Sequence, residues 1–249
     1  MDRPDSPPPA LSDLDDAALL LDFDGTLVDL AERPEAIHVP SQLSGQLEAL
    51  HASQAGALAL VSGRYLDDIR KHLGQPAIAM AGSHGAELRG ADGEALAGSH
   101  PDLPPALMGD VDRFCDSHPA VLIERKPHGI GLHYRAAAEG DGTDEAVEAF
   151  ASDLAERHGL PLKHGKKVIE VLAAPADKGV AVRALMKAGP FMGRKPIFVG
   201  DDVTDEDGFS AAADLGGFGI LVGPARESAA RYRLDSVKDV HAWLGLKVR

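Results

Sequence analysis

The stretch LLLDFDGTLVD, residues Leu19–Asp29, decides the fold, because an apolar run ends abruptly in two aspartates one residue apart and then a glycine. Short, continuous apolar runs are typical of strands buried on both faces of a parallel sheet. In such sheets, ligands bind beyond the carboxyl ends of the strands, where Asp22 and Asp24 stand. The stretch therefore predicts a strand that delivers two carboxylates to a site. The alternative is that Asp22 only ends the strand and Asp24-Gly25 forms a turn.

Short apolar runs continue to alternate with amphipathic stretches on both sides of this strand. Before residue 100 we expect helices over 42–53 and 65–73, strands at ALALVS and AIAMAG, and a hairpin in AELRGADGEALAG that turns at Asp92-Gly93. After Pro175 we expect helices over 178–188, 204–213 and 237–244 and strands at PIFVG and GILVG. This order predicts an α/β fold with a doubly wound parallel sheet.

Between these two halves the pattern changes, beginning at the proline-rich HPDLPPAL. It predicts helices over 106–116 and 143–158 and strands at VLIER, IGLHYR, PLKHG and KVIEVLA. Antiparallel strands with helices on one face are typical of α+β domains. We therefore predict a core of residues 15–102 and 174–249, an inserted α+β cap domain of residues 103–173, and a disordered amino-terminal tail of residues 1–14.

Composition excludes several classes of function. A formal charge of −14 over 249 residues argues against general binding to nucleic acids or anionic membranes, both of which require basic surface. The single cysteine, Cys115, cannot form an internal disulfide, and no apolar run approaches the roughly 18 residues that span a bilayer. We therefore expect a cytoplasmic protein with neither nucleic-acid nor membrane partners. We also expect a monomer that acts on a small molecule.

Further polar groups follow the other predicted strands. VSGR offers the Ser62 hydroxyl, PADKG places Lys178 at a helix start, and GDDVTDED offers Asp201, Asp202 and Asp205. Clustered carboxylates repel one another unless a cation compensates, and an oxygen-rich site suits Mg²⁺. A hydroxyl, an ammonium group and helix amino termini beside that cation would suit a phosphoryl group.

Each of these groups also has an ordinary structural explanation. Ser62 could cap the helix at Tyr65, TDED from Thr204 is a good capping sequence, and Lys178 could be a solvated surface lysine. Their joint occurrence at successive strand ends favours a site over coincidence.

The chain contains, in this order, the segments DFDGTL, VSGR, DKG and GDDVTDED. These segments resemble the four motifs of the haloacid dehalogenase (HAD) superfamily of phosphohydrolases. The resemblance implies a HAD-like core with a C2B-type cap. It also implies that Asp22 is the nucleophile, that Asp24 is the general acid and base, and that Ser62 and Lys178 bind phosphoryl oxygens. Mg²⁺ would be held by Asp22, the Asp24 carbonyl and Asp201, with Asp202 and Asp205 supporting these ligands.

In the predicted insertion, ERKPHGIGLHYR and GKKVIEV resemble the cap signature of one family of this superfamily, the trehalose-6-phosphate phosphatases. This resemblance implies a sugar-binding set of Glu124, Lys126, Arg135, Lys166 and Glu170. From the core, SGR and AGSHGAELR add Arg64, His84 and Gly85 to the implied substrate contacts. Glu124 and Lys126 share a strand face, and Lys166 and Glu170 would do so if their strand starts at Lys166. Acids and bases together suit sugar hydroxyls, which both donate and accept hydrogen bonds.

The two resemblances together imply a Mg²⁺-dependent phosphatase that hydrolyses trehalose 6-phosphate to trehalose and phosphate through an aspartyl-phosphate intermediate. Cross-strand salt bridges would explain the charged cap residues without a ligand. The motifs are also compatible with a phosphatase of another sugar phosphate, of the sucrose or mannosylglycerate type, with a phosphomutase, and with a non-catalytic module that binds a sugar phosphate.

Overall fold

The structure is a computed structural model, and it describes residues 3–31, 36–96, 103–126, 128–138, 140–165, 167–173 and 175–247. The chain divides into two compact units. The core unit joins Met1–Ser99 to Ala176–Arg249, and the second unit is His100–Pro175. We propose that the second unit is the inserted domain that the sequence places at residues 103–173.

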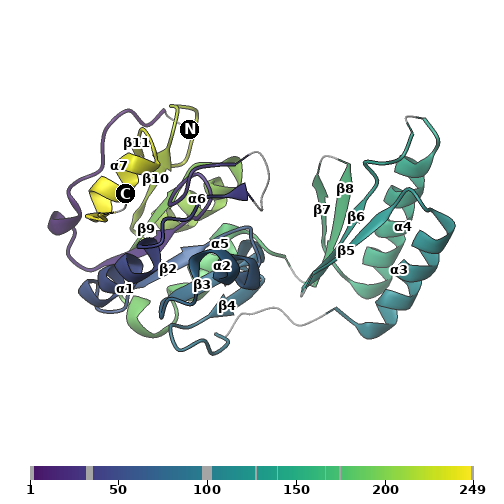
Figure 1. Ribbon diagram of the computed structural model, residues 1–249, viewed down its shortest axis with the longest axis horizontal. Helices are drawn as coiled ribbons and strands as arrows, with labels where there is room; N and C mark the ends of the chain where they lie inside the picture. The colour runs from purple at the N-terminus through teal and green to yellow at the C-terminus, as the bar shows by residue number, and fades with distance from the viewer. Residues whose placement is uncertain are drawn as a thin grey trace. The chain divides into compact units, whose positions relative to one another are not determined.

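The core unit contains a seven-stranded sheet with the strand order β11-β10-β9-β1-β2-β3-β4 (Figure 1). The strands are β1 (Ala17–Leu21), β2 (Leu58–Val61), β3 (Ala79–Gly82), β4 (Glu87–Arg89), β9 (Lys195–Gly200), β10 (Phe218–Val222) and β11 (Tyr232–Leu234). Neighbouring strands run parallel except β3 and β4, which pair antiparallel at one edge. The hairpin predicted to turn at Asp92-Gly93 is a separate one, in which Arg89 of β4 pairs with Ala95 in a single antiparallel bridge. Because β1 pairs with β2 and β9, its carboxyl end lies at the middle of the sheet edge.

Both faces of this sheet are covered, which explains why β1 is a continuous apolar run. All five β1 residues are buried. One face is covered by α1 (Leu43–Ser53), α2 (Leu66–Leu73) and α7 (Val237–Leu244), which pack against Leu19 and Leu21. The other face is covered by α5 (Lys178–Leu185) and α6 (Glu206–Asp214), which pack against Leu20. Alternate side chains of a strand point to opposite faces, so no position in β1 reaches solvent. The prediction of a doubly wound α/β core is confirmed.

The second unit is an antiparallel sheet with helices on one face (Figure 1). Its strand order is β5-β6-β8-β7, with β5 (Leu122–Lys126), β6 (Gly129–His133), β7 (Leu162–Gly165) and β8 (Val168–Leu172). Inward-facing residues such as Leu132 and Ile169 pack against α3 (Pro105–Ser117) and α4 (Thr143–His158). The remaining side chains of these strands lie on the opposite face, which no described helix covers.

Four short 3-10 helices, η1 (Leu11–Asp13), η3 (Ser83–Gly85), η4 (Gly189–Phe191) and η5 (Val203–Asp205), complete the described helical structure of the connections. The longest described α-helix, α4, has 16 residues. Within the described ranges, no helix combines the length and the apolar character that crossing a membrane requires.

The amino-terminal segment differs from the disordered tail that the sequence predicts. Over residues 3–14, Leu11 and Leu14 pack against the core, and η1 forms between them. The carbonyl of Ser6 accepts from Arg233 N (2.9 Å), and that of Pro9 accepts from Trp243 Nε1 (2.8 Å). Proline lacks an N–H but keeps its carbonyl, so this segment can still be tied down through acceptors.

Two strand assignments also differ from the sequence predictions. The edge strand β11 was not predicted, because its three residues lie among charged side chains and give no alternating pattern. The strand predicted at KVIEVLA begins at Val168, one residue after Lys167. Lys166, which would share a face with Glu170 only if the strand started there, lies outside the described residues.

Candidate active site

Asp22 follows β1 directly, at the middle of the sheet edge. Its side chain is buried, and its backbone N–H donates to the Val199 carbonyl (2.9 Å), so the pairing with β9 continues one residue beyond the strand. The backbone therefore fixes this carboxylate at the carboxyl ends of the two central strands, where ligands of such sheets bind.

Gly25 makes the close approach between the first and fourth motifs possible. It adopts φ +75° in a turn closed by a hydrogen bond from its N–H to the Val28 carbonyl (2.8 Å). A Cβ atom at this position would lie 2.1 Å from Asp201 Oδ2. The turn explanation of Asp24-Gly25 is therefore correct for the backbone, and the same turn lets Asp201 approach Asp22.

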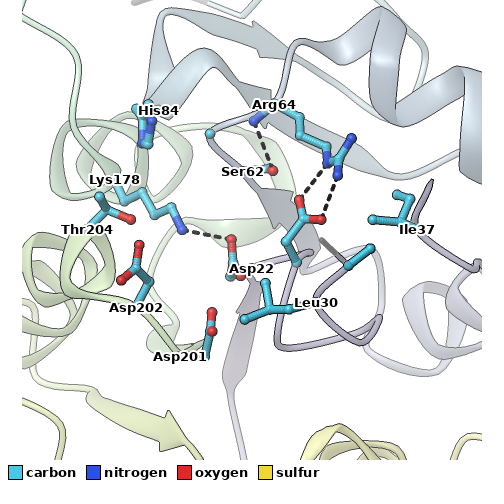
Figure 2. Close-up of a pocket in the computed structure, with 13 residues that line it drawn as sticks. Asp22, Leu30, Ile37, Ser62, Arg64, His84, Lys178, Asp201, Asp202 and Thr204 are labelled. Atoms are coloured by element: carbon cyan, nitrogen blue, oxygen red, sulfur yellow. Dashed lines mark hydrogen bonds and ion pairs between the residues drawn. The ribbon is translucent and has the colours of Figure 1, made fainter. Parts of the chain in front are cut away.

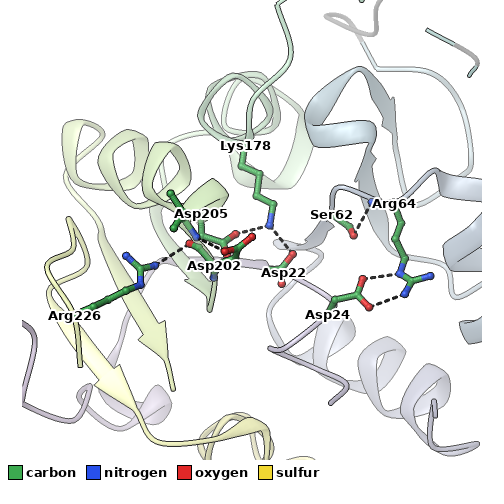
Figure 3. A network of polar contacts seen from close by, with 9 residues as sticks. Asp22, Asp24, Ser62, Arg64, Lys178, Asp202, Asp205 and Arg226 are labelled. Carbon is green, nitrogen blue, oxygen red and sulfur yellow. Dashed lines mark hydrogen bonds and ion pairs between the residues drawn. The ribbon is translucent and has the colours of Figure 1, made fainter. Parts of the chain in front are cut away.

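Lys178 joins two buried carboxylates (Figure 3). Its Nζ lies 2.7 Å from Asp22 Oδ1 and 2.5 Å from Asp205 Oδ1, and only 3% of the residue is exposed. The second oxygen of Asp205 accepts from Asp202 N (2.9 Å) within the capping box of η5. The surface-lysine explanation of Lys178 is thus wrong, whereas the capping explanation of the TDED segment is correct for Asp205.

The carboxylates outnumber the cations at this position, and their pKa values reflect it. Burial raises the pKa of Asp22, and Lys178 opposes this shift. Burial also raises the pKa of Asp201 to about 6, with Asp205 and Asp202 adding to the effect. Burial opposes the charge of Lys178, but Asp22 and Asp205 outweigh it and raise the pKa of the ammonium. A further cation would relieve the remaining repulsion between the carboxylates.

Three of these carboxylates are close enough to share one metal ion. Asp22, Asp201 and Asp205 can each place one oxygen within 4.8 Å of the others. Both oxygens of Asp205 already accept hydrogen bonds, from Lys178 and from the Asp202 backbone. Asp22 and Asp201 are therefore the better placed carboxylate ligands, and Asp205 serves to hold Lys178 and the 202–205 turn.

Asp24 points away from Asp22 and pairs with Arg64 (Figure 3). Arg64 Nε lies 2.6 Å from Asp24 Oδ2, and Arg64 Nη2 lies 2.8 Å from Asp24 Oδ1. The Arg64 backbone N–H donates to Ser62 Oγ (3.1 Å). The cap residue of α2 is Tyr65, and it makes no side-chain capping bond, so Ser62 is not the helix cap that its position suggested. The buried Ser62 hydroxyl keeps its own hydrogen to donate.

The Ser83-His84 segment packs against the loop that carries Ser62. His84 N donates to the Ser62 carbonyl (2.9 Å), and both Ser83 and His84 adopt positive φ, which is uncommon outside glycine. A Cβ atom on Gly63 would lie 2.7 Å from the His84 ring. The glycine of SGR is thus required by the imidazole that lies over it.

These side chains line one cavity of about 750 Å³ in the core unit (Figure 2). From the predicted site, the structure brings to this cavity Asp22, Asp24, Ser62, Arg64, His84, Lys178, Asp201 and Asp202. Gly85 is not among the described lining residues, because it packs on α5, where a Cβ would lie 2.9 Å from that of Ala181. Leu30 and Ile37 add apolar surface, so the cavity combines a charged floor with a partly apolar wall.

A sequence model described as trehalose-phosphatase matches residues 20–238. The chain belongs to the trehalose-phosphatase family. The probable trehalose-phosphate phosphatase of Sinorhizobium fredii is 40% identical over 235 residues, which cover 94% of this chain and 88% of that protein. The trehalose-6-phosphate phosphatase of Escherichia coli is 34% identical over 233 residues, covering 91% and 85% respectively.

Solved structures agree on the fold. The C-terminal domain of the C. albicans trehalose-6-phosphate phosphatase superposes with a TM-score of 0.67 at 22% identity and 94% coverage of each chain. A haloacid dehalogenase-like hydrolase from Bacteroides thetaiotaomicron gives 0.63 at 16% identity, covering 90% of this chain and 97% of that one. The HAD-like core with an α+β cap, predicted from the motifs, is confirmed.

In this trehalose-phosphatase family member, the helix-free face of the second unit carries a row of polar residues. The row takes one residue from each of the four strands, and these residues lie directly opposite one another: Glu124, the small Gly131, Glu170 and Lys163. Directly opposed residues share a face of the sheet. His133 Nε2 lies 2.8 Å from Glu124 Oε2, and Gly131 provides the space for this contact, since its Cβ would lie 3.0 Å from the same nitrogen. We call this row, with His133, the polar face.

The other predicted sugar-binding residues are only partly described. Lys126 ends β5 on the same face as Glu124, and its side chain lies outside the described part. Lys166 is outside the described residues altogether. Arg135 is exposed in the turn after β6, two residues beyond the strand end.

Sequence reasoning missed Lys163, His133 and Asp68. Lys163 joins the polar face only through the β7–β8 register, which a short charged segment does not reveal. His133 stood within the HYR motif, but nothing in the sequence indicated its pairing with Glu124. Asp68 follows Arg64 by four residues and contacts it, a spacing that is a usable signal at a helix start.

Proposed function

We propose that this chain is a Mg²⁺-dependent phosphatase that hydrolyses trehalose 6-phosphate to trehalose and phosphate. The observation that supports this most strongly is the Lys178 ammonium between Asp22 and Asp205 at the floor of the cavity, in a member of the trehalose-phosphatase family. A buried carboxylate beside a fixed ammonium suits nucleophilic attack on an anionic phosphoryl group.

In the proposed reaction, a carboxylate oxygen of Asp22 bonds to phosphorus as the bond from phosphorus to the sugar oxygen breaks. An aspartyl phosphate results. Asp24 donates its proton to the departing oxygen, and then takes a proton from the water that attacks the aspartyl phosphate. That attack releases phosphate and regenerates the Asp22 carboxylate. Ser62 Oγ and Lys178 Nζ bind the phosphoryl oxygens, and Arg64 and His84 contact the substrate from the cavity wall.

The donor set of the cavity fits Mg²⁺, which prefers oxygen ligands. Asp22, Asp201 and the Asp24 carbonyl would hold the ion, while Asp202 and Asp205 fix the loop that carries Asp201. When bound, the ion would neutralise the repulsion between the Asp22 carboxylate and the anionic substrate. Burial, the main cause of the raised pKa values of Asp22 and Asp201, leaves both carboxylates in surroundings where a bound cation would stabilise their charged forms.

The test is phosphate release from trehalose 6-phosphate, sucrose 6-phosphate, mannosylglycerate phosphate and glucose 6-phosphate, each with and without Mg²⁺. We expect trehalose 6-phosphate to be the best substrate by at least about tenfold in kcat/KM, and only with Mg²⁺ present. A preference for another sugar phosphate would support the alternative phosphatase. Tight binding of trehalose 6-phosphate without phosphate release would support the non-catalytic module.

We further propose that the polar face of the second unit selects the sugar. Glu124→Ala or Glu170→Ala should lower kcat/KM for trehalose 6-phosphate roughly ten- to hundredfold, because a bound sugar hydroxyl left without its hydrogen-bond partner costs about 1 to 3 kcal/mol. Hydrolysis of p-nitrophenyl phosphate, which has no sugar, should remain nearly unchanged. The measurement is the ratio of the two activities in each variant.

Glu145→Ala is the matched control, since Glu145 is exposed on α4, on the helical side of the same unit. It should leave both activities unchanged. If the Glu124 and Glu170 variants hydrolysed both substrates more slowly by the same factor, these residues would form structural ion pairs, as the Glu124 contact with His133 permits.

Mg²⁺ should stabilise the fold more at about pH 8 than at about pH 5. The pKa of Asp201 is raised from its ordinary 3.8 to about 6, so its contribution to stability is present in acid and is lost as the pH rises through about 4 to 6. Above that range the ionised carboxylate is available to the metal. At roughly 100 times Kd, the unfolding temperature should rise by roughly 5 to 10 °C.

Thermal unfolding with and without Mg²⁺ at the two pH values measures this effect. Asp201→Asn, which keeps the shape of the side chain, should remove most of the Mg²⁺ stabilisation. If Mg²⁺ raised the unfolding temperature equally at both pH values, or still raised it in Asp201→Asn, the assignment of Asp201 as a ligand would be contradicted.

A further inference from the structure

The Arg64 guanidinium connects two carboxylates. Its Nε and Nη2 donate to the two oxygens of Asp24, at 2.6 and 2.8 Å, while Nη1 donates to Asp68 Oδ2 at 2.6 Å. A bidentate pair of this kind fixes the plane and the direction of both groups. The direction of Asp24 therefore depends on Arg64, and that of Arg64 depends on Asp68.

Asp68 faces a histidine on its other side. Its Oδ1 lies 3.7 Å from His72 Nε2, one helical turn further along α2. That His72 nitrogen is buried, and the described residues offer it no hydrogen-bond partner. The Arg64 and Asp68 side chains are 11% and 34% exposed, so water screens this pair less than a surface pair.

The neighbouring acid on the same helix is different. Asp67 has 93% of its side chain exposed and lies 3.3 Å from Arg70, and it is not among the described residues that line the cavity. The two adjacent aspartates of α2 thus have the same chemistry and different surroundings, which provides a matched pair for experiments.

We propose that Asp68 is a positioning residue of the hydrolysis, which acts through Arg64 to fix the place from which the Asp24 carboxylate turns to exchange a proton with the leaving oxygen. This inference rests on the proposed phosphatase function. Replacement of Asp68 by alanine removes one acceptor of the guanidinium, which loosens Arg64 and with it the Asp24 carboxylate. Displacement of a reacting group by about 1 Å can cost on the order of 10²-fold in rate.

Two aryl phosphates test the proposal, since neither contains a sugar. p-Nitrophenolate leaves without a proton, whereas the more basic phenolate of phenyl phosphate depends on the general acid. Asp68→Ala should lower kcat/KM for phenyl phosphate roughly ten- to hundredfold and that for p-nitrophenyl phosphate by no more than about twofold. Asp24→Asn should change the ratio in the same direction and by more.

Two further variants separate positioning from a general structural role. Asp68→Glu, which keeps the carboxylate, should restore most of the activity on phenyl phosphate. Asp67→Ala should leave both activities unchanged. An equal fall for both substrates in Asp68→Ala, or an unchanged ratio of the two activities, would overturn the proposal.

A second measurement does not depend on turnover. The Arg64 Nε–H, identified in the NMR spectrum by its absence in Arg64→Lys, should exchange with water at least about tenfold faster in Asp68→Ala than in the wild type or Asp67→Ala. Unchanged exchange would overturn the inference alone. If the wild type hydrolysed neither aryl phosphate while the Arg64 Nε–H still exchanged faster in the Asp68 variant, the proposed function would be contradicted instead.

Discussion

Asp22→Asn is expected to abolish phosphate release, by at least about 10⁴-fold in kcat, while the fold is retained. The substitution removes the carboxylate that attacks phosphorus, and effects of this size are typical when a nucleophile is removed. Asparagine has nearly the same shape, and Lys178 keeps its contact with the buried Asp205 (2.5 Å), so no buried ammonium is left unpaired.

Phosphate release under single-turnover conditions, together with thermal unfolding, tests this prediction. Asp15→Asn, at the exposed opposite end of β1, is the matched control and should have full activity. An unfolding temperature within a few degrees of the wild type would establish that the fold is retained. Turnover of more than a few percent in a pure preparation would be incompatible with Asp22 as the nucleophile.

Removal of Mg²⁺ is expected to have the second largest effect. A chelator should lower phosphate release by at least about 10²-fold and reversibly, and Asp201→Ala should do so at any ordinary Mg²⁺ concentration. Without the cation, the substrate phosphate would meet an Asp22 carboxylate that only Lys178 compensates. Ca²⁺, which tolerates more ligands and looser geometry, should bind without supporting turnover.

Phosphate release with a chelator, with Mg²⁺ restored and with Ca²⁺ added measures the effect. Asp235→Ala, an exposed acid whose side chain contacts Arg233 in the core unit, is the control and should respond to Mg²⁺ like the wild type. Full activity in excess chelator would mean that the carboxylate cluster has another role.

Much of the fold could be predicted from local patterns in the sequence. The apolar run into Asp22 predicted β1 and its position, and periodic segments predicted α4 and α7 with the bounds that the structure has. Such patterns depend on which residues lie near one another along the chain, so one sequence reveals them. The three-residue β11 and the docking of residues 3–14 depend on partners elsewhere in the fold, and no local pattern indicated them.

The sequence likewise predicted some contacts of the candidate site and not others. Motif order indicated that Asp22, Ser62, Lys178 and Asp201 would meet at the strand ends, since parallel strands deliver their ends to one edge. It did not reveal that Arg64 would clamp Asp24, that Asp205 would hold Lys178, or that Gly131 would leave room for His133. These contacts depend on rotamers and strand register, which the surrounding packing determines.

The separation of Asp22 and Lys178 by 156 residues has a consequence for how the protein is made. During synthesis, β1 leaves the ribosome long before its partner β9, so one edge of an entirely apolar strand stays unpaired while the second unit is translated. The apolar cluster of that second unit draws on residues 103–171 alone and can close first. The charge of Lys178 is balanced fully only when Asp205 has emerged, which makes completion of the catalytic floor a late event in the folding of the core.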